Sequence, residues 1–222
     1  MQYGEHKLKL EKFFESLKAG ETVLIEHDSK SVPVHSFYSL TKCAGNMRVL
    51  VDDFLDTLYI YKVHLELSGT DTSKFEDLQV IKIGGVKSVG KIVGKISSRG
   101  GVILRREYQM IYENAIDDGS LVINPVLGIE KLLILGSSRL EVLETLAEIS
   151  SRLGDKRRIA VYFVDKSVLK TGEFNPLPIM EFLSTTVVNV EKRGRVYTFE
   201  VLKSINPELD GKTYSYDLDV VE

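Results

Sequence analysis

The chain has 222 residues, of which 43% are hydrophobic and 27% are charged, and its net charge is −3 at pH 7. This length fits one large α/β domain or two small ones, and the charge gives no global attraction to nucleic acid or to an anionic membrane. No stretch approaches the roughly 18 apolar residues of a membrane span, and the N-terminal segment lacks the apolar run of a signal peptide. A single cysteine, Cys43, cannot form an internal disulfide. These features predict a cytoplasmic protein that does not bind a membrane.

The first third of the chain alternates between helix-like and strand-like segments. Apolar residues recur at helical spacing in three segments, and continuous β-rich apolar runs separate them. We expect helices at 5–19, 32–44 and 54–67, and buried strands at 22–25 and 47–51.

The alternation continues to about residue 165 and then changes. By the same criteria, we expect strands at 78–83, 120–124 and 158–164 and helices at 102–116 and 139–153. The strand 120–124 is expected to end at Pro125, and the glycine-rich segment 84–92 is read as a twisted hairpin. Beyond Asp165, the segments 185–194, 195–203 and 212–220 alternate apolar and polar residues over short turns, which is typical of antiparallel strands.

This order predicts an α/β fold with three layers, in which a mostly parallel sheet ends in a C-terminal antiparallel hairpin extension. No linker rich in Pro, Gly or Ser divides the chain. We therefore expect a single domain over residues 1–222.

Four segments resemble the RecA/KaiC-type ATPases. "LEKFFESLKAGETVLIE" (10–26) is similar to the helix and Gly-Glu turn that precede the phosphate-loop strand of those proteins, and "NMRVLVDD" (46–53) resembles their second core strand. "SLVINP" (120–125) falls where the Walker B strand would lie, and the segment 187–218 resembles their terminal hairpin. Over nearly its full length the chain looks like the uncharacterised KaiC-like family of hyperthermophilic archaea. The resemblance implies a RecA-like sheet and makes self-association plausible.

The segment that corresponds to the phosphate loop departs from the pattern of the family. A phosphate loop needs glycines, a lysine for the β and γ oxygens, and a Ser or Thr for magnesium. Here the turn contains no glycine, and Pro33 and Val34 fall where the lysine and the hydroxyl residue would be. Asp28 would repel a triphosphate. Asn124 replaces the carboxylate of the Walker B strand, and Asp52 and Asp53 fall near the position of a catalytic glutamate.

The hypothesis that follows is a non-catalytic RecA/KaiC-like module with a lost ATP site, which binds a protein or peptide partner or a second copy of itself. Because ligands of open α/β sheets bind at the carboxyl ends of the strands, the altered loop would face such a partner. No catalytic residue, cofactor or metal is assigned. The candidate binding residues are His27, Asp28, Ser29, Lys30, Ser31, Asp52, Asp53 and Asn124.

An alternative hypothesis is a nucleotide-binding ATPase with an unusual phosphate loop. Lys30 could serve such a loop. The segment from Gly85 to Lys91 also has the glycine and lysine spacing of a Walker A motif, although Ile92 follows where Ser or Thr is needed.

A second alternative is nucleic-acid binding through residues 82–106, which contain seven basic residues and no acidic one. If this segment is a strand, Lys87, Lys91 and Lys95 share one face and form, with Arg99, a basic patch. The other interpretation is an edge strand that lysines protect against aggregation. The patch contains no interleaved aromatic residues for base stacking, which favours the edge strand.

The histidines do not indicate a metal site. His27 with Asp28 and His35, or His64 with the two aspartates 52 and 53, could be drawn as ligand sets. Neither set has the i,i+4 spacing of a helical histidine pair, and a second cysteine is absent from the sequence.

Overall fold

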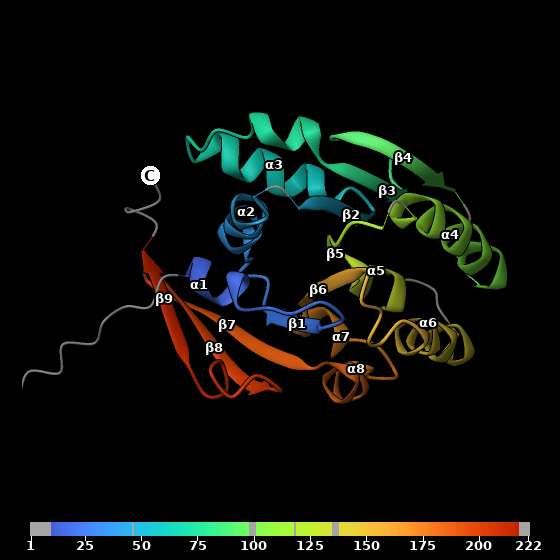
Figure 1. Cartoon of the computed structure of the whole chain (residues 1–222). Coiled ribbons are helices and arrows are strands. Elements are labelled where there is room, and N and C mark those ends of the chain that lie inside the picture. The colour runs from blue at the N-terminus through green and yellow to red at the C-terminus, as the bar shows by residue number, and fades with distance from the viewer. Residues whose placement is uncertain (1–9, 46, 98–100, 118, 135–137, 218–222) are drawn as a thin grey trace, which may run out of the picture.

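The structure is a computed structural model that describes residues 10–45, 47–97, 101–117, 119–134 and 138–217. Within these residues, nine strands form one sheet in the order β4-β3-β2-β5-β6-β1-β7-β8-β9 (Figure 1). The pairs from β4 to β7 are parallel, and β7-β8 and β8-β9 are antiparallel. The strands are β1 (Thr22–His27), β2 (Arg48–Phe54), β3 (Gln79–Ile83), β4 (Lys91–Ile96), β5 (Val122–Leu127), β6 (Arg158–Asp165), β7 (Thr186–Arg193), β8 (Val196–Ser204) and β9 (Thr213–Asp217).

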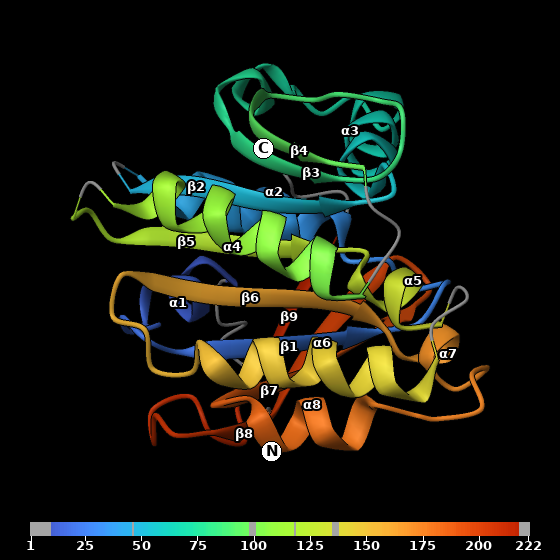
Figure 2. The same ribbon diagram turned by 90° about the vertical axis from the view of Figure 1, so that its right-hand side faces the viewer.

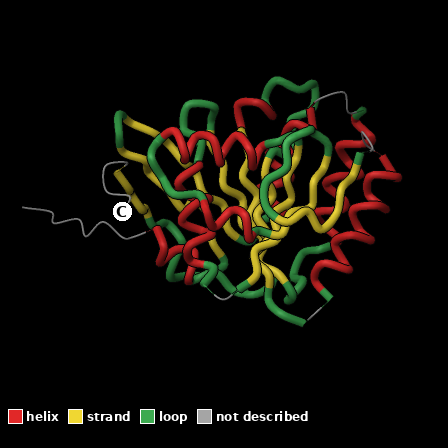
Figure 3. Tube along the Cα trace, turned by 90° about the horizontal axis from the view of Figure 1, so that it is seen from above, coloured by secondary structure: helices red, strands yellow, loops and turns green. Residues whose placement is uncertain are grey.

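Helices cover both faces of the sheet, so that the molecule has three layers (Figures 2 and 3). One face carries α1 (Leu10–Glu15), α2 (Val34–Cys43), α3 (Thr57–Leu67) and the 3-10 helix η1 (Ser73–Asp77), and the other carries α4 (Gly101–Ile116), α6 (Arg139–Ser151) and α8 (Leu177–Leu183). The short helices α5 (Ile129–Ile134) and α7 (Lys166–Leu169) follow directly on β5 and β6.

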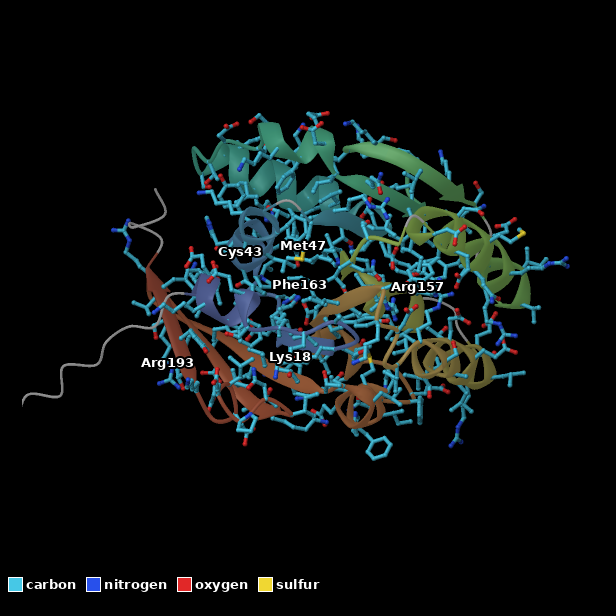
Figure 4. The ribbon with its side chains drawn as sticks, in the orientation of Figure 1. Lys18, Cys43, Met47, Arg157, Phe163 and Arg193 are labelled. Atoms are coloured by element: carbon cyan, nitrogen blue, oxygen red, sulfur yellow. The ribbon has the colours of Figure 1, made fainter. Side chains whose placement is uncertain are left out.

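Each face has its own hydrophobic core. On the α2 side, Phe163 of β6 is buried, and its ring centroid lies 6.0 Å from that of Phe37 of α2. Figure 4 labels Phe163, and also Cys43, which is half-buried in α2. On the α4 side, Tyr112, Leu146 and Met180 pack against the even-numbered residues of β6. A strand that is buried on both sides reads as a continuous apolar run, which is why 158–164 was predictable.

These findings confirm the predicted fold class, with its mostly parallel sheet and antiparallel C-terminal strands. Of the predicted first helix, residues 5–9 lie outside the described residues, as do 218–220 of the last strand. Within the described residues, no helix is long and apolar enough to cross a membrane.

The segment after β3 is not the predicted hairpin. β4 is parallel to β3. Residues 84–90 therefore carry the chain from the end of β3 back to the level at which β3 begins, where β4 starts. Gly85 has a φ of +73°, and a Cβ there would lie 2.3 Å from Asp56 Oδ1. The absence of a side chain at Gly85 therefore lets the backbone lie close to the Asp56 carboxylate. A side chain at this position would collide with that carboxylate.

Several strands extend beyond their predicted ends: β1 reaches His27 and β6 reaches Asp165, and two further extensions concern Asp52, Asp53 and Asn124. β2 continues to Phe54, so Asp52 and Asp53 lie within the strand and point to opposite faces of the sheet. β5 passes through Pro125 to Leu127, although Pro125 was expected to end it. Both differences determine where the predicted site residues lie.

Candidate functional site

The loop 27–31 starts at His27, the last residue of β1, and is closed by one of its own carboxylates. Asp28 Oδ1 accepts the backbone N–H groups of Lys30 at 2.9 Å and Ser31 at 2.8 Å. Partial burial raises the pKa of Asp28, but these hydrogen bonds outweigh it, and the pKa is lowered. Asp28 is thus held as an anion that uses two of the donors a phosphate loop would offer to a nucleotide.

The rest of this loop is attached to the neighbouring strands. Ser29 Oγ donates to Asp165 Oδ2 at 2.7 Å, at the end of β6, and Ser31 Oγ accepts the N–H of Lys192 in β7 at 3.1 Å. His27 is buried, and burial lowers its pKa, so that the ring is neutral at pH 7. Its Nδ1 donates to the Asp28 carbonyl at 3.0 Å. Ser29 and Lys30 remain exposed at the tip.

Asp53 belongs to a different group, on the α3 side of the sheet. Lys82 Nζ contacts Asp53 Oδ2 at 2.6 Å and Asp56 Oδ1 at 2.5 Å, and the Lys82 and Asp53 side chains are each 2% exposed. Asp56 also accepts the N–H groups of Val86 and Lys87 at 2.9–3.0 Å. The backbone N–H groups of Val86 and Lys87, in the glycine-rich segment after β3, are therefore also occupied by a carboxylate of the chain.

The expected basic patch does not share one face of a strand. Lys87 lies before β4, with Nζ 5.4 Å from the centre of the Tyr59 ring. Lys91 pairs with Gln79 and Lys95 with Lys82, and because Val93 is an extra residue between these pairs, Lys91 and Lys95 point to opposite faces. Arg99 lies outside the described residues.

Asp52 and Asn124 lie together on the α4 side, away from the loop. Tyr108 Oη donates to Asp52 Oδ2 at 2.6 Å, and Asn124 Nδ2 lies 3.2 Å from the same oxygen. Asn124 Nδ2 also donates to the Leu50 carbonyl at 2.8 Å, beside Pro125, whose nitrogen cannot donate. Asn124 thus repairs the ladder between β2 and β5, which makes the pairs 48–122, 49–123, 52–126 and 53–127 but not the two between them.

Two arginines complete this buried group, and neither was among the residues predicted from the sequence. Arg158 Nη1 donates to Asn124 Oδ1 at 2.9 Å. Arg152 lies with its guanidinium carbon 4.2 Å from the centre of the Tyr112 ring and 4.7 Å from that of Tyr108. Two features of the sequence could have indicated this group. Tyr108 and Tyr112 are four residues apart on one predicted helix, and Arg158 is at the start of a predicted buried strand.

The eight candidate residues therefore form three separate groups: the loop 27–31 with Asp165, the buried ion cluster of Asp53, and the Asp52–Asn124 network. No group of three or more His, Cys, Asp or Glu residues that could hold a metal ion occurs among the described residues.

The parallel sheet, its antiparallel end and the helices on both faces define a RecA-like α/β protein. A crystal structure of a KaiC-like protein from the hyperthermophilic archaeon Pyrococcus horikoshii OT3 has this fold, with a TM-score of 0.58 over 90% of this chain and 86% of that one. The two sequences are only 13% identical, so the likeness shows the fold alone.

Residues 12–215 match the family described as "Pyrococcus protein of unknown function, DUF257", and the chain belongs to this family. A second Pyrococcus horikoshii OT3 protein, from a structural study, is 31% identical, with a TM-score of 0.79 over 92% of this chain and 97% of that one. The chain matches no curated protein.

Proposed function

We propose that this protein is a non-catalytic RecA/KaiC-like module of the cytoplasm whose ATP site has been lost, and that the loop 27–31 binds a protein or peptide partner or a second copy of the chain. The observation that carries the proposal is the Asp28 carboxylate, which occupies the N–H groups of Lys30 and Ser31. A nucleotide phosphate would have to displace a charged group that is covalently part of the loop.

Thermal unfolding with and without millimolar Mg-ATP, Mg-ADP or GTP tests the loss of the site. A ligand at 100 times its dissociation constant stabilises a protein by about 2.7 kcal/mol, which is visible as a shift of the midpoint. We expect no shift. A shift with Mg-ATP that disappears in Lys30→Ala or Lys91→Ala would contradict the proposal and support the ATPase alternative.

The binding role of the loop needs a different measurement. Light scattering during gel filtration reports the mass of the protein in solution. If the loop pairs two copies, Lys30→Glu at its exposed tip should lower the mass to that of the monomer. The matched variant Lys95→Glu, exposed on β4, should leave it unchanged. If the wild type is already a monomer, self-association through the loop is excluded, and the proposal then requires a different protein partner.

In that case, a capture experiment compares wild-type and Lys30→Glu protein as bait. The proposal requires that the wild type retains a protein that the variant does not retain.

The nucleic-acid alternative predicts affinity that falls steeply with salt, because bound phosphates release counterions. The structure gives this alternative little support, since Lys82 is buried and paired and Lys91 lies 2.8 Å from Asp77.

A further inference from the structure

The helices α4 and α6 are neighbours on the face of the sheet opposite the α2 side (Figure 2), and a pocket of about 70 Å³ lies between them. A water molecule needs about 10–15 Å³ of such volume, so the pocket has room for a group of about four or five non-hydrogen atoms. The apolar residues of its lining are Phe54, Leu104, Val126, Ile129, Leu132 and Ile149. A short apolar group is therefore the content that this lining favours.

Two half-buried side chains of opposite charge line the same pocket from its two helical walls. They are Arg105 of α4 and Glu144 of α6, and both retain surface that a molecule in the pocket reaches. Among the described residues, neither makes a hydrogen bond or an ion pair. The pocket therefore offers one cation and one anion that the protein itself does not use.

The remaining charged residues of the lining are engaged within the protein. Their partners are Tyr108 for Asp52, the N-cap residue Ser138 for Glu141, and Arg152 for Glu148. Only Arg105 and Glu144 are thus left to select a ligand by its charge.

Arg105 and Glu144 lie at the same level of the two helices. Because the strands from β4 to β6 are parallel, α4 and α6 both run back from the carboxyl ends of the strands. The guanidinium carbon of Arg152 lies 4.2 Å from the centre of the Tyr112 ring, and this contact fixes the register of the helices. Arg105 is seven residues before Tyr112, and Glu144 is eight residues before Arg152, which is about two turns in each helix. The two charged residues therefore lie opposite each other across the pocket.

A free α-amino acid with an aliphatic side chain carries the groups that this arrangement selects. Its carboxylate accepts from a guanidinium, its ammonium donates to a carboxylate, and the two charges are close together at one end of the molecule. A molecule with only one of these charges leaves either Arg105 or Glu144 without a partner.

We propose that the pocket between α4 and α6 binds a free aliphatic α-amino acid of the size of leucine, whose side chain has four carbons. The carboxylate of the amino acid pairs with Arg105, its ammonium pairs with Glu144, and its side chain lies against Ile129 and Ile149. The site shares no residue with the loop 27–31, so its test is independent of the proposed function.

Methyl NMR of the full chain, with Ile, Leu and Val methyl groups labelled, tests the proposal with unlabelled L-leucine as the probe. Titration should shift the signals of Leu104, Ile129 and Ile149 at millimolar concentrations, whereas the signal of Leu67, which is 82% exposed on α3, should not move. Three further probes each lack one part of leucine: 4-methylpentanoate lacks the ammonium, 3-methylbutylamine lacks the carboxylate, and glycine lacks the side chain. Each should bind at least tenfold more weakly than leucine.

Two variants assign the charged groups of the ligand to their partners. In Arg105→Gln the carboxylate of leucine loses its partner, so leucine should bind no better than 3-methylbutylamine. In Glu144→Gln the ammonium loses its partner, so leucine should bind no better than 4-methylpentanoate. Arg106→Gln is a matched control, because Arg106 is exposed on α4 and does not line the pocket, and it should keep the preference of the wild type.

The proposal is overturned if saturating leucine moves none of the pocket signals, or moves the signal of Leu67 as much as those of the pocket. It is equally overturned if either singly charged probe binds the wild type as tightly as leucine does, or if Arg105→Gln and Glu144→Gln keep the preference of the wild type.

Discussion

Lys82 illustrates how a single residue can be misread from sequence. In the sequence it is the first of seven basic residues in the segment 82–106, which contains no acidic residue, and this composition indicates a solvated surface. In the structure its ammonium is buried between Asp53 and Asp56, and Asp53 also accepts the N–H of Leu58 at 2.9 Å. The cluster joins β2, β3 and the start of α3. It therefore holds the segment between β3 and β4 in place and is not available to a partner.

We expect Lys82→Met to lower the free energy of unfolding by about 3–5 kcal/mol, because it leaves two carboxylates near each other with their cation removed. Lys91→Met removes an exposed ion pair with Asp77, which solvent screens, so we expect a much smaller loss. Urea unfolding of the two variants measures the difference. Equal small losses would show that the buried cluster does not stabilise the fold.

At the residue scale, the sequence was sufficient to place residues 28–31 in one turn after a strand, although His27 is still part of that strand. It was not sufficient for Asp52 and Asp53, which were treated as a pair. Neighbours in a strand point to opposite faces, and the apolar pattern did not reveal that β2 continues to Phe54. One undetected extension of a strand thus separated two candidate residues.

Among the elements, β5 contains a proline whose missing N–H is compensated by a neighbouring side chain. A proline in a central strand removes a hydrogen bond of the ladder, and Asn124 replaces it through Nδ2. This compensation couples a side chain to the backbone of the neighbouring strand, so it could not be foreseen from residues 120–125 alone.

Asn124→Asp would install the acidic residue that the resemblance to RecA/KaiC proteins leads one to expect. We predict a loss of about 2 kcal/mol or more in unfolding free energy, because the donor to Leu50 disappears and a second carboxyl group is buried beside Asp52. Asn175→Asp is a matched control, since the exposed Asn175 only accepts a bond from the Leu177 N–H. Thermal unfolding compares the two. A variant Asn124→Asp as stable as the control would contradict the role assigned to Asn124.

The contact of α8 with β1 gives the protein a pH dependence. Burial and the neighbouring Glu181 raise the pKa of Glu26 from 4.5 to about 7, against Lys166 and Lys170 of the α7 region, which lower it. Burial likewise raises the pKa of Glu130 to about 7. Between these values the folded state binds protons that the unfolded state has released, so stability falls as the pH rises from about 4.5 to 7.

Each unit of pKa difference corresponds to about 1.4 kcal/mol. We expect the wild type to lose stability between pH 5 and pH 8, and Glu26→Gln or Glu130→Gln to flatten this loss. Glu208→Gln, in an exposed turn, should keep the slope of the wild type. Denaturant unfolding across this range checks the prediction, and Glu26→Gln and Glu130→Gln variants that both keep the slope of the wild type would show that the two carboxyl groups are not held protonated.

For the whole molecule, the alternation of apolar runs and amphipathic segments was enough to predict the layers and the antiparallel end. The direction of β4 was not predicted, because residues 84–92 were read as a twisted hairpin, whereas β4 begins at Lys91 and runs parallel to β3. The short helices α5, α7 and α8 were also missed, since four to seven residues give too little periodicity.

The two loops that were candidates for phosphate binding have a common feature that only the structure shows. In each, an aspartate of the chain accepts the backbone N–H groups, Asp28 in one and Asp56 in the other.

Titration calorimetry of Mg-ATP into the wild-type protein at pH 7 tests this feature most directly, because it measures binding with no assumption about catalysis. The closed loops predict no saturable heat at protein concentrations near 100 µM, which corresponds to a dissociation constant weaker than about 1 mM, or a binding free energy of less than about 4 kcal/mol in magnitude. A saturable one-to-one isotherm in the micromolar range would contradict the account, since it would require a phosphate to displace Asp28 or Asp56 from its own backbone.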